Sequence, residues 1–125
     1  MNLSINDIKN LPRKEEDLQK SFFTWFWFAH PAYKNRIYHI PNGGHRNKIV
    51  AAKLKEQGVL PGAWDVFLSI PKGRWAGMYI ELKVGKNILT DNQIAFMEAN
   101  KNDYFFCLCK TIDELMREVN GYLKL

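Results

Sequence analysis

The chain has 125 residues, which is long enough for one domain with its own core and too short for two. Its hydrophobic content of 46% and aromatic content of 14% exclude a disordered chain and indicate a packed globular domain. The formal net charge of +5 favours an anionic partner, either nucleic acid or a membrane surface. No apolar run approaches membrane-spanning length, and we expect no signal peptide.

The first predicted element is a helix from about Arg13 to Ala29, after a weakly patterned segment, residues 1–12. At about 100° per residue its apolar side carries Leu18, Phe22, Trp25, Phe26 and Ala29. Glu15 and Gln19 project onto that side, whereas Glu16 does not. A carboxylate at the edge of a buried face is costly unless a group such as a metal ion compensates it. The alternative is a first-turn glutamate that the helix dipole favours.

This helix is unusually rich in aromatic residues: six of the seven from Phe22 to Phe28 are aromatic. One helix face cannot bury them all, and Phe23 and Trp27 form a second stripe. Exposed aromatic patches mark interaction surfaces, so we expect a second subunit to cover this stripe in a homodimer.

A strand from Arg36 to Pro41 and a turn at residues 42–44 lead to a second predicted helix, Arg46 to Gln57. Its apolar stripe is formed by Val50, Ala51 and Leu54, and basic residues flank that stripe. The pattern predicts a helix that lies on the sheet and extends its lysines towards a phosphate backbone. A helix whose basic face is merely solvated has the same pattern.

The stretch from Pro61 to Lys83 contains two short apolar runs, Val66 to Ile70 and Met78 to Val84, joined by a glycine-containing connection. They predict an antiparallel hairpin. Alternation places Glu81 and Lys83 on the strand face that carries Tyr79. With Asp65 brought close by the hairpin, two carboxylates and an ammonium could hold a divalent ion beside a phosphate. The alternative is a turn aspartate and a solvated strand face.

The C-terminal third predicts a helix, a strand and a closing helix. Thr90 to Gln93 has the pattern of a capping box, which is a structural alternative to a catalytic role for Gln93. Ile94 and Met97 are expected to carry this helix into the core. Tyr104 to Cys109 follows as a strand, and Thr111 opens a helix with its own capping box and with Leu115, Met116, Val119 and Leu123 inward.

Cys107 and Cys109 lie two residues apart and therefore on one strand face. Neighbours on one extended strand rarely have disulfide geometry, and the three histidines follow no zinc-finger spacing. We expect two buried thiols in a reducing cytoplasm.

The alternation of helices and strands predicts an α/β fold, with a central mixed sheet flanked by helices and no internal repeat. A restriction-endonuclease-like core with one inserted helix fits this order.

From about Glu15 to Cys109 the chain resembles the PD-(D/E)xK nuclease superfamily, and more closely its virus-type replication-repair nucleases, the VRR-NUC domain. The resemblance rests on the NGG stretch at residues 42–44, the QGVLPGAWD block ending at Asp65, IELK ending at Lys83, and LTDNQ ending at Gln93. The family also has a Glu followed four residues later by Gln in the first helix, as at Glu15. The chain departs from the family at Trp64, where proline is usual.

The resemblance implies a Mg²⁺- or Mn²⁺-dependent endonuclease that hydrolyses DNA phosphodiester bonds. Its catalytic residues would be Glu15, Asp65, Glu81, Lys83 and Gln93. Asp65, Glu81 and the Leu82 carbonyl would bind the metal, with Glu15 joining directly or through water. The candidate DNA contacts are Asn42, Gly43, Gly44, His45, Arg46, Lys48, Lys53 and Arg74.

Stand-alone members resemble Holliday-junction resolvases, which implies a homodimer that acts on branched DNA in the bacterial cytoplasm, as a phage or prophage protein. A nuclease that prefers flaps or nicked duplexes remains open. The alternative from another class is a DNA-binding subunit without catalytic activity. Acids that repel phosphate have no purpose in such a subunit.

Overall fold

The computed structural model describes residues 14–41 and 47–125, so the candidate DNA contacts at residues 42–46 lie outside the described chain. The elements in chain order are α2 (Glu15–Ala29), the 3-10 helix η1 (Pro31–Arg36), β1 (Ile37–His39), α3 (Lys48–Glu56), β2 (Val66–Leu68), β3 (Met78–Leu82), α4 (Asp91–Asn100), β4 (Phe105–Cys109) and α5 (Ile112–Leu123). Apart from η1, this is the predicted order. Among the described residues no helix is long and apolar enough to span a membrane.

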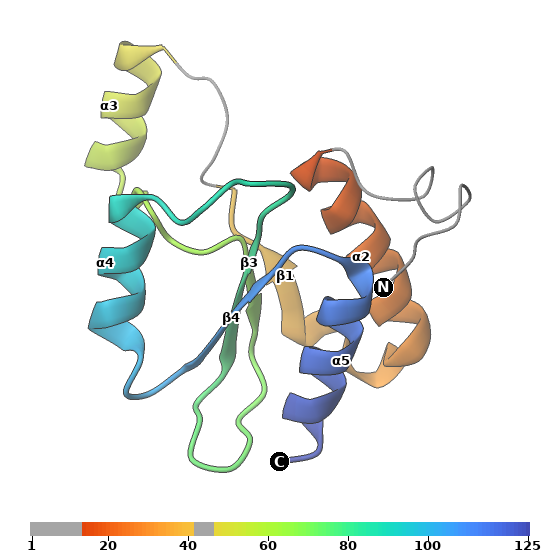
Figure 1. Cartoon of the computed structure of the whole chain (residues 1–125). Helices are drawn as coiled ribbons and strands as arrows, with labels where there is room; N and C mark the ends of the chain where they lie inside the picture. Colours follow the sequence, from red (N-terminus) through yellow and green to blue (C-terminus); the bar gives the residue numbers. More distant parts are fainter. Residues whose placement is uncertain (1–13, 42–46) are drawn as a thin grey trace.

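One four-stranded sheet, ordered β1-β2-β3-β4, forms the centre of the domain (Figure 1). β1, β2 and β3 pair antiparallel, as the predicted hairpin requires. β4 runs parallel to β3, and α4 supplies the crossover that a parallel pair needs. The prediction of a mixed sheet flanked by helices is therefore confirmed.

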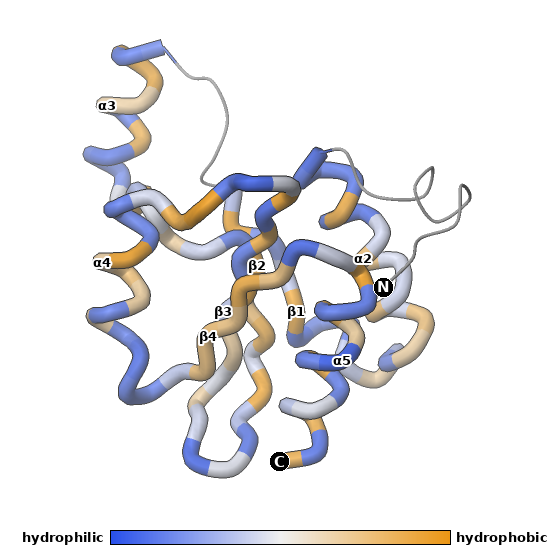
Figure 2. Tube along the Cα trace, viewed as in Figure 1, coloured by the Kyte–Doolittle hydropathy of each residue, from blue (hydrophilic) through white to orange (hydrophobic). Residues whose placement is uncertain are grey.

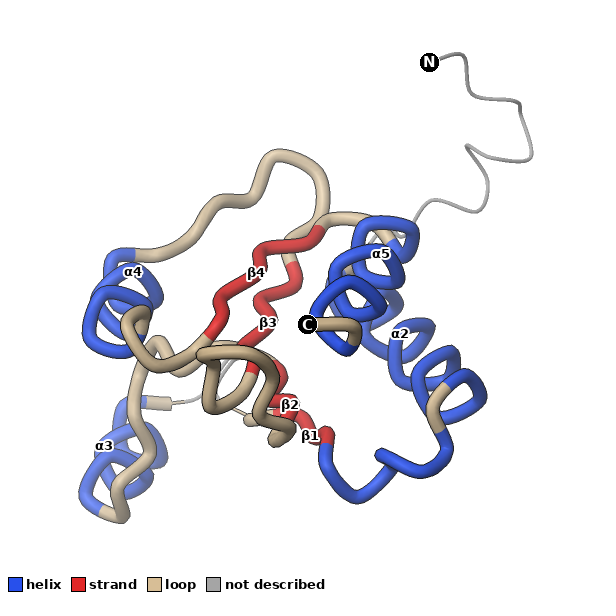
Figure 3. Tube along the Cα trace, turned by 90° about the horizontal axis from the view of Figure 1, so that it is seen from below, coloured by secondary structure: helices blue, strands red, loops and turns tan. Residues whose placement is uncertain are grey.

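The main hydrophobic core lies between one sheet face and the helices α2 and α5, which stand together on that side in Figure 3. The strands contribute alternate residues to it, because side chains alternate between faces. Apolar segments accordingly gather on β2, β3 and β4 between the helices (Figure 2). The core residues of the strands are Ile37, Val66, Leu68, Met78, Ile80, Leu82, Cys107 and Cys109. Both cysteines are buried free thiols on one face, as predicted.

The opposite sheet face carries an aromatic layer that α4 covers. Tyr79 stacks on Phe106 with ring centroids 5.3 Å apart, and Phe96 of α4 meets Tyr79 edge-on at 5.1 Å. The expectation that Ile94 enters the core is wrong, because its side chain is 41% exposed. Phe96 takes that place, since aromatic rings on this face offer an edge-to-face partner.

α3 stands beside α4 and clear of the sheet (Figures 1 and 3). The prediction that it lies on the sheet is wrong: none of its residues is buried, and Ile49 is 70% exposed. The physical reason is that α4 and the aromatic layer already cover this face.

The second aromatic stripe of α2 is only partly at the surface. Phe23 is buried in the core, so the expectation that it is surplus is wrong. Trp27 is half-exposed, and Phe28, which was not assigned to the stripe, is 88% exposed. The exposed aromatic ridge of α2 is therefore formed by Trp27 and Phe28.

Candidate active site

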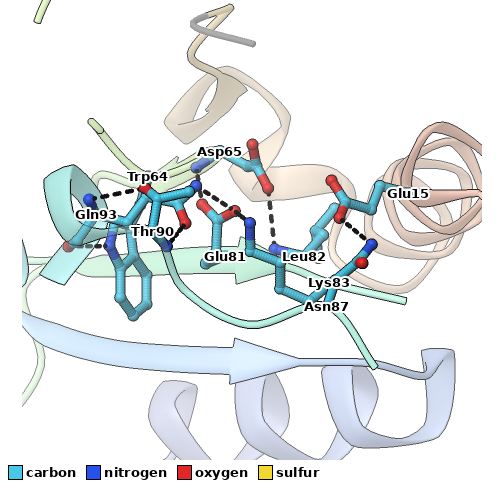
Figure 4. A network of polar contacts seen from close by, with 9 residues as sticks. All are labelled: Glu15, Trp64, Asp65, Glu81, Leu82, Lys83, Asn87, Thr90 and Gln93. Atoms are coloured by element: carbon cyan, nitrogen blue, oxygen red, sulfur yellow. Dashed lines mark hydrogen bonds and ion pairs between the residues drawn. The ribbon is translucent and has the colours of Figure 1, made fainter. Parts of the chain in front are cut away.

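The predicted catalytic side chains meet in one open cleft of about 370 Å³ at the end of the sheet where β3 finishes. The cleft is lined by Glu15, Pro61, Gly62, Ala63, Asp65, Glu81, Lys83, Thr90, Asn92 and Gln93. All five candidates thus come together from four separate stretches of the chain. Figure 4 shows them as one network of polar contacts.

Asp65 and Glu81 face each other because the β2–β3 register, in which Val66 pairs with Ile80, brings the residue before β2 opposite Glu81. The backbone N–H of Asp65 donates to Glu81 Oε1 at 3.2 Å. The backbone N–H of Leu82 donates to Asp65 Oδ2 at 3.0 Å. Each carboxylate thereby accepts a hydrogen bond from a main-chain donor.

Glu81 is a buried acid, with only 1% of its surface exposed. Burial, and then the neighbouring Asp65 carboxylate, raise the pKa of Glu81 to about 8, while Lys83 opposes the shift. A carboxyl group in this environment is charged at neutral pH only when more positive charge comes close. This is the electrostatic setting of a group that accepts a cation.

Lys83 follows β3 directly and lies on the Glu81 face, as strand alternation predicted. Its Nζ lies 3.4 Å from Glu81 Oε2, and the side chain is buried. Lys83 also lines the cleft. Its ammonium can therefore donate there to a water or a phosphate oxygen.

Gln93 caps α4, as one of the two sequence interpretations predicted, and its side chain also contacts Glu81. Thr90 and Gln93 form a complete capping box at the start of α4, in which Gln93 Oε1 accepts from the Thr90 N–H at 2.9 Å. The other end of the same amide, Nε2, donates to Glu81 Oε2 at 3.0 Å. The cap therefore fixes an amide that in turn holds Glu81.

Glu15 lies in the first turn of α2, lines the cleft and accepts from Asn87 Nδ2 at 3.3 Å. Glu16 instead points to solvent and pairs with Lys20 at 2.9 Å. The predicted phase of the helix is therefore the one observed.

The donor set suits a hard divalent ion better than a soft one, because it consists of carboxylate and carbonyl oxygens. Asp65 and Glu81 line the same cleft, where burial and then the Asp65 carboxylate raise the pKa of Glu81. Among the described residues, however, no three Asp, Glu, His or Cys side chains are grouped tightly enough to hold one ion. Glu15 therefore fits the outer role, through water, and not direct ligation.

The candidate DNA contacts are not all near the cleft. Lys48 and Lys53 lie on the exposed helix α3. Arg74 lies at the opposite end of β3 from Lys83, and β3 alone spans about 15 Å at roughly 3.3 Å per residue. Arg74 instead covers the ring of Trp75, 4.2 Å from its centroid.

Several residues in or next to the cleft were not predicted to belong to the site, and three of them contact its predicted members or shape its loop: Gly62, Trp64 and Asn87. Gly62 has φ +92°, and a Cβ there would lie 2.4 Å from the backbone oxygen of Asn92, so this glycine lets the loop approach α4. In the sequence, the Pro61-Gly62 pair predicted a turn but not the close approach of this loop to α4. Trp64 and Asn87 carry no sequence signal, since their roles depend on tertiary neighbours.

No family model matches the chain, and no curated protein matches it by sequence. A solved structure described as a VRR_NUC domain protein superposes on it with a TM-score of 0.78. That structure is 27% identical, and the match covers 91% of each chain. The same carboxylates, lysine and glutamine that the sequence resemblance singled out lie together in the cleft. The structural likeness therefore supports a VRR-NUC domain, and the mixed sheet flanked by helices is consistent with the restriction-endonuclease-like fold of that nuclease family.

Proposed function

We propose that the protein is a Mg²⁺- or Mn²⁺-dependent endonuclease that hydrolyses phosphodiester bonds in DNA. The observation that supports this most strongly is the pair of Asp65 and Glu81, two carboxyl groups held together by backbone donors in an open cleft. Such a pair is unfavourable without a counter-charge, and Lys83 alone leaves the pKa of Glu81 high.

Asp65, Glu81 and the Leu82 carbonyl would hold the ion, with Glu15 reaching it through water. When bound, a divalent ion polarises the scissile phosphate and lowers the pKa of the attacking water. The side chains of this chain provide the positioning. Gln93 keeps the Glu81 carboxylate turned towards Asp65, and Asn87 keeps Glu15 at the edge of the cleft.

Lys83 is the group suited to orient the attacking water. Its ammonium is buried beside Glu81, and within the described parts of the chain Glu81 is the one carboxylate that pairs with its three donors. It would also neutralise the negative charge that develops on the phosphate oxygens, a contribution that is large in a site shielded from solvent.

DNA would approach the cleft along the side where α3 stands. Three lysines of α3 are exposed to solvent: Lys48, Lys53 and Lys55. Basic residues on an exposed helix bind the phosphate backbone without reading sequence. This position favours contact with DNA at a distance from the cut, and it makes α3 a better candidate than the Arg74 loop.

A DNA-binding subunit without catalytic activity is less consistent with the site. Glu81 is buried and Asp65 is half-buried beside it in the cleft, where the acids would repel a phosphate backbone. A buried carboxylate is costly unless something compensates its charge, and a purely structural role gives no reason to keep an acid at Glu81 beside a second acid.

Branched DNA is the proposed substrate class, and a homodimer is the proposed assembly. Trp27 and Phe28 give α2 an exposed aromatic ridge, and a 460 Å³ groove lined by Phe23, Trp27 and Tyr38 lies beside it. A second copy would cover the ridge, and two active sites related by two-fold symmetry suit a symmetric junction. The site of action would be the cytoplasm of a bacterial host.

The function is tested by incubating the protein with junction, flap, nicked, linear and single-stranded DNA, with Mg²⁺, with Mn²⁺ and with excess chelator. Metal-dependent cuts are expected, fastest on the junction. Lys83→Ala is the matched inactive control, since it leaves the carboxyl pair in place. Equal cleavage by wild type and this variant would show a contaminating nuclease, and no cleavage by the wild type would contradict the proposal.

A further inference from the structure

Trp64 is fully buried between the hairpin and α4, with 1% of its surface exposed. Its indole N–H donates to the backbone carbonyl of Gln93 at 3.0 Å (Figure 4). Its ring meets the edge of Phe106 with centroids 4.8 Å apart and an interplanar angle of 85°. One side chain thus ties the residue before Asp65 to the first turn of α4.

This contact closes a ring of interactions around the site. Trp64 holds the main chain of Gln93, the Gln93 amide holds Glu81 Oε2, and Glu81 Oε1 accepts the N–H of Asp65. Asp65 is the next residue after Trp64, so the ring returns to its start. A displacement of the Gln93 main chain therefore moves the donor that aligns Glu81.

α4 needs such a tether because none of its side chains is fully buried. Few apolar contacts hold it on the sheet, and elements of this kind open locally at low cost in free energy. Besides the capping box of Thr90 and Gln93, its first turn is held by the close approach of Gly62 to Asn92 and by the hydrogen bond of Trp64. The proline that is usual in the family at this position has no side-chain donor.

We propose that Trp64 is a positioning residue, which sets the Gln93 amide against Glu81 and so keeps the carboxyl pair ready to bind a divalent ion. This inference rests on the proposed metal site. It assigns to Trp64 a role in metal affinity, beyond that of a core residue.

The test compares Mn²⁺ binding to the DNA-free protein by calorimetry, together with the thermal midpoint, in four variants. Trp64→Phe removes the donor and keeps a ring against Phe106. Tyr122→Phe is the matched control, because it also deletes one buried donor to a backbone carbonyl, that of Ile70 at 2.6 Å, far from the cleft. Gln93→Ala and the double variant with Trp64→Phe complete a cycle.

Trp64→Phe is expected to weaken Mn²⁺ binding roughly tenfold, as outer-sphere changes do. Tyr122→Phe should lower the thermal midpoint to a similar extent and leave Mn²⁺ affinity unchanged. Trp64→Phe should add little in the Gln93→Ala background, because its effect passes through that amide. The inference would be overturned if Trp64→Phe lowered Mn²⁺ affinity equally in the wild-type and Gln93→Ala backgrounds, or if Trp64→Phe bound Mn²⁺ as tightly as Tyr122→Phe does. Either result would leave the nuclease proposal intact. A wild type that binds no Mn²⁺ and cuts no DNA would overturn both.

Should Trp64→Phe not fold, the wild type supplies the second measurement. The indole N–H resonance of Trp64 should shift when Mg²⁺ is added, and this shift should be lost in Gln93→Ala, whereas the Trp75 resonance at the far end of the sheet should not move. A Trp64 shift that survives in Gln93→Ala would overturn the inference.

Discussion

Asp65 and Glu81 are each anchored by the strand that carries the other. The N–H of Asp65 donates to Glu81 Oε1 at 3.2 Å, and the N–H that follows Glu81, that of Leu82, donates to Asp65 Oδ2 at 3.0 Å. The pair is therefore part of the hairpin and not an addition to it. Substitutions that preserve these hydrogen bonds should spare the fold and affect only the chemistry.

Glu81→Gln should reduce cleavage by about 100-fold or more while leaving the fold intact. The amide keeps an acceptor for the Asp65 N–H but removes a charge that a divalent ion needs. Because the pKa of Glu81 is raised to about 8, the metal-free protein at pH 7 already carries a mostly neutral side chain there, and glutamine resembles it. Cleavage at saturating Mg²⁺ and the circular dichroism spectrum are the measurements. Full activity in this variant would remove Glu81 from the mechanism.

Lys83→Ala should lower the rate by about 100-fold to 1,000-fold, the usual loss when a donor to developing charge is removed. Divalent-ion affinity should not fall in parallel, because the carboxyl pair remains. Single-turnover rates and Mn²⁺ calorimetry separate the two effects. A variant that loses ion binding as completely as Glu81→Gln would show that Lys83 supports the pair and does not act on the water.

Glu15→Ala should lower activity about tenfold, whereas Glu16→Ala should change it little. Glu15 lines the cleft and is held by Asn87, but Glu16 is exposed and pairs with Lys20 on the helix surface. Exposed ion pairs of this kind contribute little to stability, so both variants should fold. Initial cleavage rates of the two variants are the measurement. A larger loss in Glu16→Ala than in Glu15→Ala would show that Glu16, and not Glu15, is the functional carboxylate.

The metal-free protein should lose stability as the pH rises from about 5 to 8. An unfolded Glu81 releases its proton near pH 4.5, but the folded one keeps it to about pH 8. Between these values the folded state binds more protons, so the free energy of unfolding falls with pH, by an amount on the order of a few kcal/mol. Urea titrations with chelator at several pH values measure this.

Glu81→Gln is the control for that titration, since it lacks the group and should lose most of the slope. Added Mg²⁺ should reduce the fall in the wild type, because it compensates the charge. The same pH slope in both proteins would assign the effect to other groups.

The sequence was sufficient to predict the hairpin, the mixed sheet and the meeting of Asp65, Glu81 and Lys83, because these depend on local alternation and short-range register. The phase of Glu15 followed from helical periodicity in the same way. What local patterns could not give was the packing between distant elements. Phe23 looked surplus on one helix, yet the core has room for it.

α3 was placed on the sheet because its apolar stripe resembles that of a packed helix, although α4 had taken the face through Phe96. The choice between two helices for one face depends on contacts that no single stretch encodes. Gln93 shows the reverse case. Capping and catalysis were its competing interpretations. One end of its amide caps α4 and the other donates to Glu81, so the cap does not prevent Gln93 from reaching the site.

The last prediction concerns assembly. Phe28 is 88% exposed and Trp27 lies beside it under the ammonium of Lys34, 5.3 Å from the ring. Exposed aromatic residues of this size are usually covered by a partner, so we expect a homodimer in solution with Trp27 and Phe28 near the interface. Phe28→Glu and Trp27→Glu should each give a folded monomer in sedimentation equilibrium. Ile94→Glu, a matched change at an exposed apolar residue of α4, should leave the dimer unchanged. A wild-type monomer at micromolar concentration would contradict the dimer, and a dimer that survives both α2 substitutions would place its interface elsewhere.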